Sequence, residues 1–147
     1  MNKIKFIVFI IFVSVYGNVI KAENNIAIKK YLNKKNIEKA TTQIYLLNRC
    51  SAVYAYASAV ILKSDTKNSK KFIDVANSLL FKSVELRIID SEEKFEDAKK
   101  KAEKERKNLF KKYVEDGEKN WKKNKSYFKG SYITEDMTFC EKLIDSK

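Results

Sequence analysis

The sequence contains no histidine and no proline, and it has only three glycines and two cysteines among 147 residues. Without histidine the chain cannot form a Ser-His-Asp or Cys-His catalytic site or a histidine metal site. The shortage of glycine leaves neither a phosphate-cradling loop nor a nucleophile elbow. These absences exclude most catalytic chemistry, so we expect no enzyme activity, no cofactor and no metal.

Paired carboxylates are the catalytic arrangement that the composition still permits. Glu92, Glu93, Glu96 and Asp97 form a dense acidic cluster, but they lie among lysines in a segment expected to be exposed. A catalytic acid needs burial to raise its pKa. We therefore interpret these residues as solvated helix charges, with a carboxylate-based enzyme as the alternative.

The first 22 residues have the layout of a secretory signal peptide. Lys3 and Lys5 precede an apolar run from Phe6 to Tyr16, and Ala22 supplies a small residue for cleavage. The run is shorter than the roughly 20 apolar residues that span a bilayer. We predict a signal peptide at 1–22 and a single helical domain at 23–147. The alternatives are a retained anchor, a first helix of the fold, or a different cleavage site.

The chain is strongly basic, with a formal net charge of +12. Residues 1–22 hold three lysines and no acid, so residues 23–147 carry +9. Such a charge favours anionic partners such as lipid headgroups or acidic polysaccharide. Only three basic residues are arginine, which binds phosphate better than lysine does, so nucleic acid is not expected. The alternative is that AT-rich codons supply much of the lysine.

The two cysteines, Cys50 and Cys140, are 90 residues apart. An even number of cysteines in an exported protein predicts a disulfide. This bond would tie the first helix to the last, and the alternative is two buried free thiols. A redox-active dithiol is not expected, because it normally uses Cys-X-X-Cys.

The spacing of apolar residues predicts an all-α protein. We expect three long helices at about 27–63, 70–89 and 92–124, with Ile37 and Ile89 among the core positions. A short C-terminal helix should follow a loop at 126–133. The expected architecture is an antiparallel helical bundle.

The helix boundaries rest on individual capping residues. Asn68 or Ser69 is expected to cap the second long helix, and Thr134 the last one. Asp90 should separate the second helix from the third, and without that break the two would form one rod. Gly117 could kink or end the third helix.

A run of small residues marks the middle of the first predicted helix. Ser51, Ala55 and Ala59 recur every four residues, and Tyr54 lies at their edge. Small residues at this spacing allow another helix to approach closely, which is the interpretation we favour. The alternative is a groove for a lipid or cofactor.

The most basic segment is 99–125, with 12 Lys and Arg against five Asp and Glu. A basic helix with aromatic residues can lie on an anionic surface. The candidate binding residues are Lys99, Lys100, Lys104, Lys107, Lys111, Lys112, Lys119, Lys122, Lys123 and Trp121. The alternative is a solvated bundle face whose aromatic residues pack the core.

Two short segments, Arg49–Ala52 and Asp136–Cys140, are similar to segments of small exported helical proteins of AT-rich bacteria. No activity or residue role follows from this resemblance. We expect a non-enzymatic helical-bundle protein of the bacterial envelope, periplasmic or secreted, that binds a protein partner or serves as a structural accessory. The alternative function is a binder of membrane surfaces or anionic polymers through 99–125. A secreted eukaryotic protein is also compatible with the composition.

Overall fold

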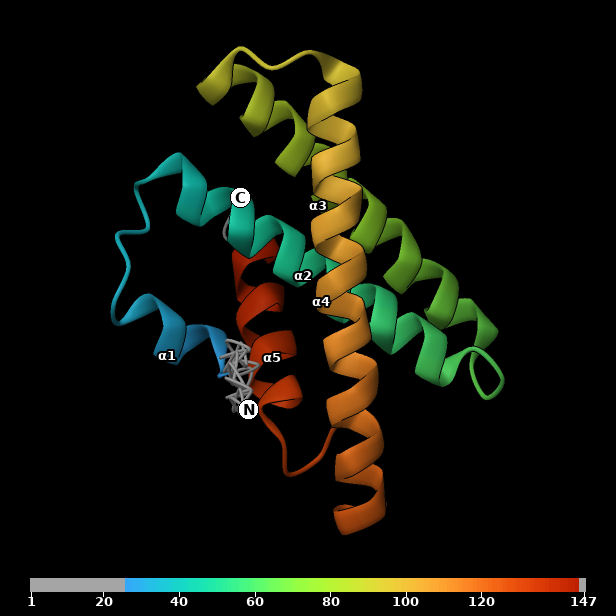
Figure 1. Ribbon diagram of the computed structural model, residues 1–147. Coiled ribbons are helices and arrows are strands. Elements are labelled where there is room, and N and C mark those ends of the chain that lie inside the picture. The colour runs from blue at the N-terminus through green and yellow to red at the C-terminus, as the bar shows by residue number, and fades with distance from the viewer. Residues whose placement is uncertain (1–25, 146–147) are drawn as a thin grey trace, which may run out of the picture.

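The computed structural model describes residues 26–145, which form a helical bundle without strands in that part of the chain (Figure 1). The helices are α1 (Ile28–Leu32), α2 (Ala40–Ile61), α3 (Thr66–Ser91), α4 (Phe95–Asn124) and α5 (Tyr132–Asp145). The predicted all-α class and bundle-like packing are confirmed. The predicted signal peptide at 1–22 lies outside the described residues.

The first long helix is shorter than predicted, because α1 and α2 are separate helices. Residues 33–36 are Asn-Lys-Lys-Asn and offer no apolar side chain to a core. The Asn36 side chain accepts a hydrogen bond from the Glu38 N–H at 2.8 Å, which favours a turn over a helix. As a result α1 turns away from α2 and lies beside α5 (Figure 1).

Helices α2 and α3 form a tightly packed antiparallel pair. Ser51 Oγ donates to the Ala76 carbonyl at 2.7 Å, and Ser58 Oγ and Ser69 Oγ each donate to the other residue's carbonyl. The predicted caps of α3 are therefore wrong: Ser69 binds across the pair, and Asp65 is the cap, accepting from the Asn68 N–H at 3.0 Å.

The break between α3 and α4 is confirmed, since Glu92 adopts a left-handed conformation with φ of 51°. The ends of α3 and α4 nearest this break share a small second core of Val84, Ala98 and Ala102. The prediction of Ile89 as a core residue is wrong, because it is 78% exposed. Ile88 packs against the second core, and the next residue on a helix is turned by about 100°.

Helix α4 crosses the α2–α3 pair and runs past α5 (Figure 1). It continues through Gly117, where a Cβ atom would stand 1.8 Å from the Tyr56 hydroxyl. Glycine is thus required for the close approach of α4 to α2, and it does not end the helix. The main core, which includes Val53, Tyr113 and Ile133, receives buried side chains from all five helices.

Helix α5 begins at Tyr132, two residues before the predicted start. Ser131 Oγ accepts a hydrogen bond from the Ile133 N–H at 3.3 Å and caps the helix. The Thr134 hydroxyl donates instead to the Phe128 carbonyl, so the prediction of Thr134 as the cap is wrong.

Candidate functional site

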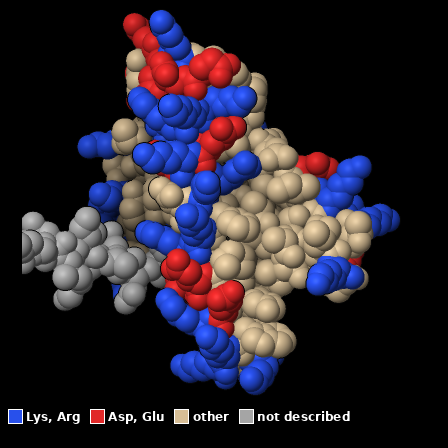
Figure 2. Space-filling view, turned by 45° about the vertical axis from the view of Figure 1, so that its right-hand side comes forward, with Lys and Arg blue, Asp and Glu red and all other residues tan. Residues whose placement is uncertain are grey.

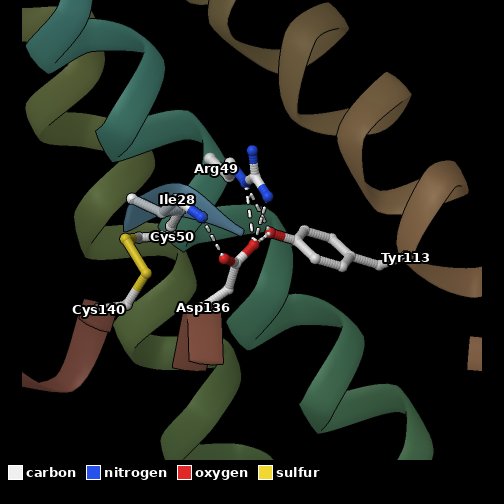
Figure 3. Close-up of a disulfide and its surroundings, with 6 residues drawn as sticks. All are labelled: Ile28, Arg49, Cys50, Tyr113, Asp136 and Cys140. Carbon is white, nitrogen blue, oxygen red and sulfur yellow. Dashed lines mark hydrogen bonds and ion pairs between the residues drawn. A yellow bond between two sulfur atoms is a disulfide. The ribbon is translucent and has the colours of Figure 1, made fainter. Parts of the chain in front are cut away.

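The structure joins Cys50 of α2 and Cys140 of α5 in the predicted disulfide, with Cα atoms 5.5 Å apart (Figure 3). Both cysteines are fully buried. The bond fixes α5 to the centre of α2 from a position inside the core.

A buried ion pair lies next to the disulfide. Arg49 donates to Asp136 Oδ2 through Nε at 3.0 Å and through Nη2 at 2.6 Å (Figure 3). The Tyr113 hydroxyl donates to the same oxygen at 2.7 Å, and the Ile28 N–H donates to Oδ1 at 2.7 Å. Arg49 also donates to the Ile26 carbonyl. One network therefore connects α1, α2, α4 and α5.

Burial and charge act in opposite directions on the pKa values of this network. Burial by itself lowers the pKa of Arg49, but Tyr113 and Asp136 raise it above its ordinary value. Burial raises the pKa of Tyr113 well above 10, and Asp136 adds to that rise. Burial also raises the pKa of Asp136, against the stabilising effect of Arg49, Tyr113 and the Ile28 amide. Both carboxylate oxygens are occupied by donors of the protein itself, which indicates a structural role.

Sequence reasoning missed this network. Asp136 is fully buried, although a carboxylate in the first turn of a helix is usually exposed to solvent. The signal was its spacing, because Asp136 lies four residues before Cys140 and therefore on the same helix face. Arg49 directly precedes Cys50, so the disulfide brings the two charges together.

Some of the small residues of α2 that were predicted to pack against another helix do so. Ser51 is fully buried against α3, and the Tyr54 ring meets the Phe72 ring of α3 edge to face at 5.6 Å. Ala55 is half-buried, but Ala59 is exposed. The neighbouring Ser58 contacts α3 where Ala59 was expected to do so. Ala59 therefore lies outside the α2–α3 contact and lines a pocket with Tyr56 and Val114.

The candidate anion-binding lysines of α4 are all exposed. Basic side chains follow α4 down the molecule in Figure 2, beside a broad area without charge. Trp121 is 43% exposed, and its ring stacks on Tyr127 with centroids 4.8 Å apart. The apolar face of α4, including Leu109 and Tyr113, is buried in the bundle. The helix can therefore offer charge to a surface but cannot insert its apolar face into one.

A groove of about 460 Å³ lies where α2, α3 and α5 meet. Eight of its eleven lining residues are aliphatic, three are polar or charged, and none is aromatic. The lining residues are Ile37, Gln43, Leu46, Leu47, Leu79, Lys82, Glu85, Leu86, Ile89, Leu143 and Ile144. The prediction of Ile37 as a core residue is wrong, because it is 48% exposed at the edge of this groove. We call this site the aliphatic groove.

No known protein family matches this chain, and no curated protein or solved structure does so either. In residues 26–145 no helix is both long and apolar enough to cross a bilayer. The same part of the chain has no group of acidic or sulfur ligands placed to hold a metal ion. The aliphatic groove and the exposed lysines of α4 are therefore the two surfaces from which a function can be inferred.

Proposed function

We propose that this chain is an exported, non-enzymatic helical-bundle protein of the bacterial envelope that binds a protein partner through the aliphatic groove. The observation that carries the proposal is the groove itself, where Ile37 and Ile89 stay exposed although the fold offers neighbouring aliphatic side chains. Burial of such surface is favourable by about 25 cal/mol per Å². The disulfide supports an oxidising compartment such as the periplasm.

A non-enzymatic role is supported by how the buried ionisable groups are used. Arg49, Asp136 and Tyr113 bind one another and the backbone, and each of the three side chains is at most 2% exposed. Catalytic acids and bases need access to a substrate as well as a shifted pKa. The network has the shifted pKa values but offers no access.

The proposal is tested by photo-crosslinking in cells, with a crosslinking amino acid at Gln43 inside the groove. We expect one defined adduct with another protein, and we expect Ile89→Asp to abolish it. Because Ile89 is 78% exposed, this change should leave the fold intact. The matched control is Leu62→Asp, which alters another exposed apolar residue outside the groove. Recovery of only the uncrosslinked monomer would contradict the proposal. Equal loss of the crosslinked adduct in the Ile89→Asp and Leu62→Asp variants would also contradict it.

The alternative function is binding of an anionic surface or polymer through 99–125. It is supported by the exposure of all nine candidate lysines and by the net charge of the chain. Because the apolar face of α4 is buried, such binding would be electrostatic and would weaken with salt. Equal binding to neutral and anionic vesicles, or no binding to any anionic probe, would exclude it.

A further inference from the structure

Four lysines of α4 lie in one line along the exposed side of the helix. Lys100, Lys104, Lys107 and Lys111 follow one another at intervals of four, three and four residues, which places them on one face. With a rise of about 1.5 Å per residue, successive lysines are about 4.5–6 Å apart along the axis. All four are exposed, and none forms an ion pair with another described residue. We call them the lysine row.

Acidic residues within this stretch of α4 do little to neutralise the row. Glu105 faces the bundle, where it accepts from Asn48 at 2.6 Å and pairs with Arg87 at 2.7 Å. Glu103 is the other acid between 99 and 112, and Lys99, Lys101 and Lys112 add positive charge nearby. Acids gather beyond both ends, at 96–97 and at 115–118. In Figure 2 basic groups outnumber acidic ones along this side of the molecule, and acidic groups lie among them as well as above and below.

The shape of the row decides between two classes of anionic partner. A flat bilayer laid against α4 would also meet the acids at both ends, and α4 cannot insert its buried apolar face to compensate. A linear polyanion can follow a row that is one lysine wide and bend away from the helix at each end. Charge complementarity therefore favours the linear polymer.

We infer that the lysine row is a docking site for a linear polyanion, of the chemical class of acidic polysaccharides. This inference rests on the alternative function proposed above and narrows it to four residues and one kind of ligand. Anionic groups of the polymer would pair with successive lysines, and binding would release the counterions of both partners. The affinity should therefore fall steeply as salt is added.

The test measures binding of heparin, a linear sulfated polysaccharide, to the full mature chain by titration calorimetry at several salt concentrations. The row variant carries Lys100→Gln, Lys104→Gln, Lys107→Gln and Lys111→Gln. The matched control carries Lys63→Gln, Lys67→Gln, Lys70→Gln and Lys71→Gln, which remove the same charge from exposed residues around the α2–α3 turn. We expect the row variant to weaken binding at least about tenfold and the control much less.

The possible results distinguish failure of the lysine row from failure of anion binding as a whole. Equal weakening in both variants would overturn the lysine row while leaving anion binding by net charge in place. Row-dependent binding to phosphatidylglycerol vesicles but not to heparin would overturn the linear polymer in favour of a bilayer. Failure of the unmodified chain to bind heparin or vesicles would overturn both the inference and the alternative function. Circular dichroism of both variants verifies that they are folded.

Discussion

At the scale of single residues, the buried pair of Arg49 and Asp136 is the feature on which most elements depend. Removal of one partner from a buried ion pair leaves an uncompensated charge, which costs far more than loss of an exposed pair. The network also receives Ile28 and Tyr113, so its loss should affect α1 and α4 as well as α5.

We expect Asp136→Asn to lower the free energy of unfolding by about 3–5 kcal/mol, because Arg49 then stays charged without its partner. Urea unfolding followed by circular dichroism measures the change. Lys119→Gln is the control, since it breaks the exposed pair of Lys119 with Asp116 and should change the free energy of unfolding far less. A loss of under 1 kcal/mol for Asp136→Asn would show that the pair is dispensable.

The raised pKa values of two buried tyrosines predict how the stability of the protein changes at alkaline pH. Burial raises the pKa of Tyr56 to about 12 and that of Tyr113 well above 10. Between pH 10 and about 12 the folded protein keeps protons that the unfolded chain releases, so the free energy of unfolding must fall as pH rises through this window. Below pH 10 both states are protonated and this contribution is constant.

Tyr56→Phe should therefore make the alkaline loss of stability less steep, because one of the two retained protons is removed. The measurement is urea unfolding at several pH values above 9, with tyrosinate absorbance to follow ionisation. The neutral-pH stability should change little, since the Tyr56 hydroxyl makes only a long 3.4 Å contact to the Tyr127 carbonyl. An unchanged pH dependence would contradict the assignment.

At the scale of elements, the crossing of α2 and α4 depends on one glycine. Alanine normally stabilises a helix relative to glycine by up to about 1 kcal/mol. At Gly117 the added methyl group would meet the Tyr56 hydroxyl and its ring, so either the buried Tyr56 ring or one of the helices must shift.

Gly117→Ala should therefore destabilise the protein by about 1–3 kcal/mol. Helix propensity by itself would predict the opposite effect, a stabilisation. Thermal and urea unfolding measure the effect. Asn108→Ala, at an exposed position of the same helix, is the control and should be neutral or slightly stabilising. Stabilisation by Gly117→Ala would mean that α4 does not approach α2 this closely.

At the scale of the whole molecule, the disulfide closes a loop of 90 residues and joins α5 to the centre of α2. In the chain-entropy model a loop of that length stabilises a fold by about 4–5 kcal/mol. Helix α5 has 14 residues and packs mainly on α2 and α1, so it has few other anchors.

We expect Cys50→Ala with Cys140→Ala to lower the free energy of unfolding by about 2–5 kcal/mol. Hydrogen exchange should show that α1 and α5 lose protection first, because the bond and the Arg49 network hold both helices. The α2–α3 pair, with its own serine contacts, should stay protected and serves as the internal control. Uniform loss of protection in all helices would contradict this order.

Much of the fold follows from the sequence by itself. The all-α class, the break near Asp90 and the exposed lysines of α4 depend on local periodicity and on the near absence of chain breakers, which any helix expresses without its partners. The pairing of Cys50 with Cys140 followed from the predicted export together with the count, since two cysteines allow one intramolecular bond.

Tertiary structure alone decided the rest. The burial of Asp136 and the exposure of Ile37 and Ile89 depend on which helix faces meet. Periodicity identifies an apolar face, but it does not say whether another helix covers all of it. The aliphatic groove exists because α2, α3 and α5 cover only part of their shared apolar surface. The buried ion pair exists because α1, α2, α4 and α5 meet beside the disulfide, where Arg49, Tyr113 and the Ile28 amide reach Asp136.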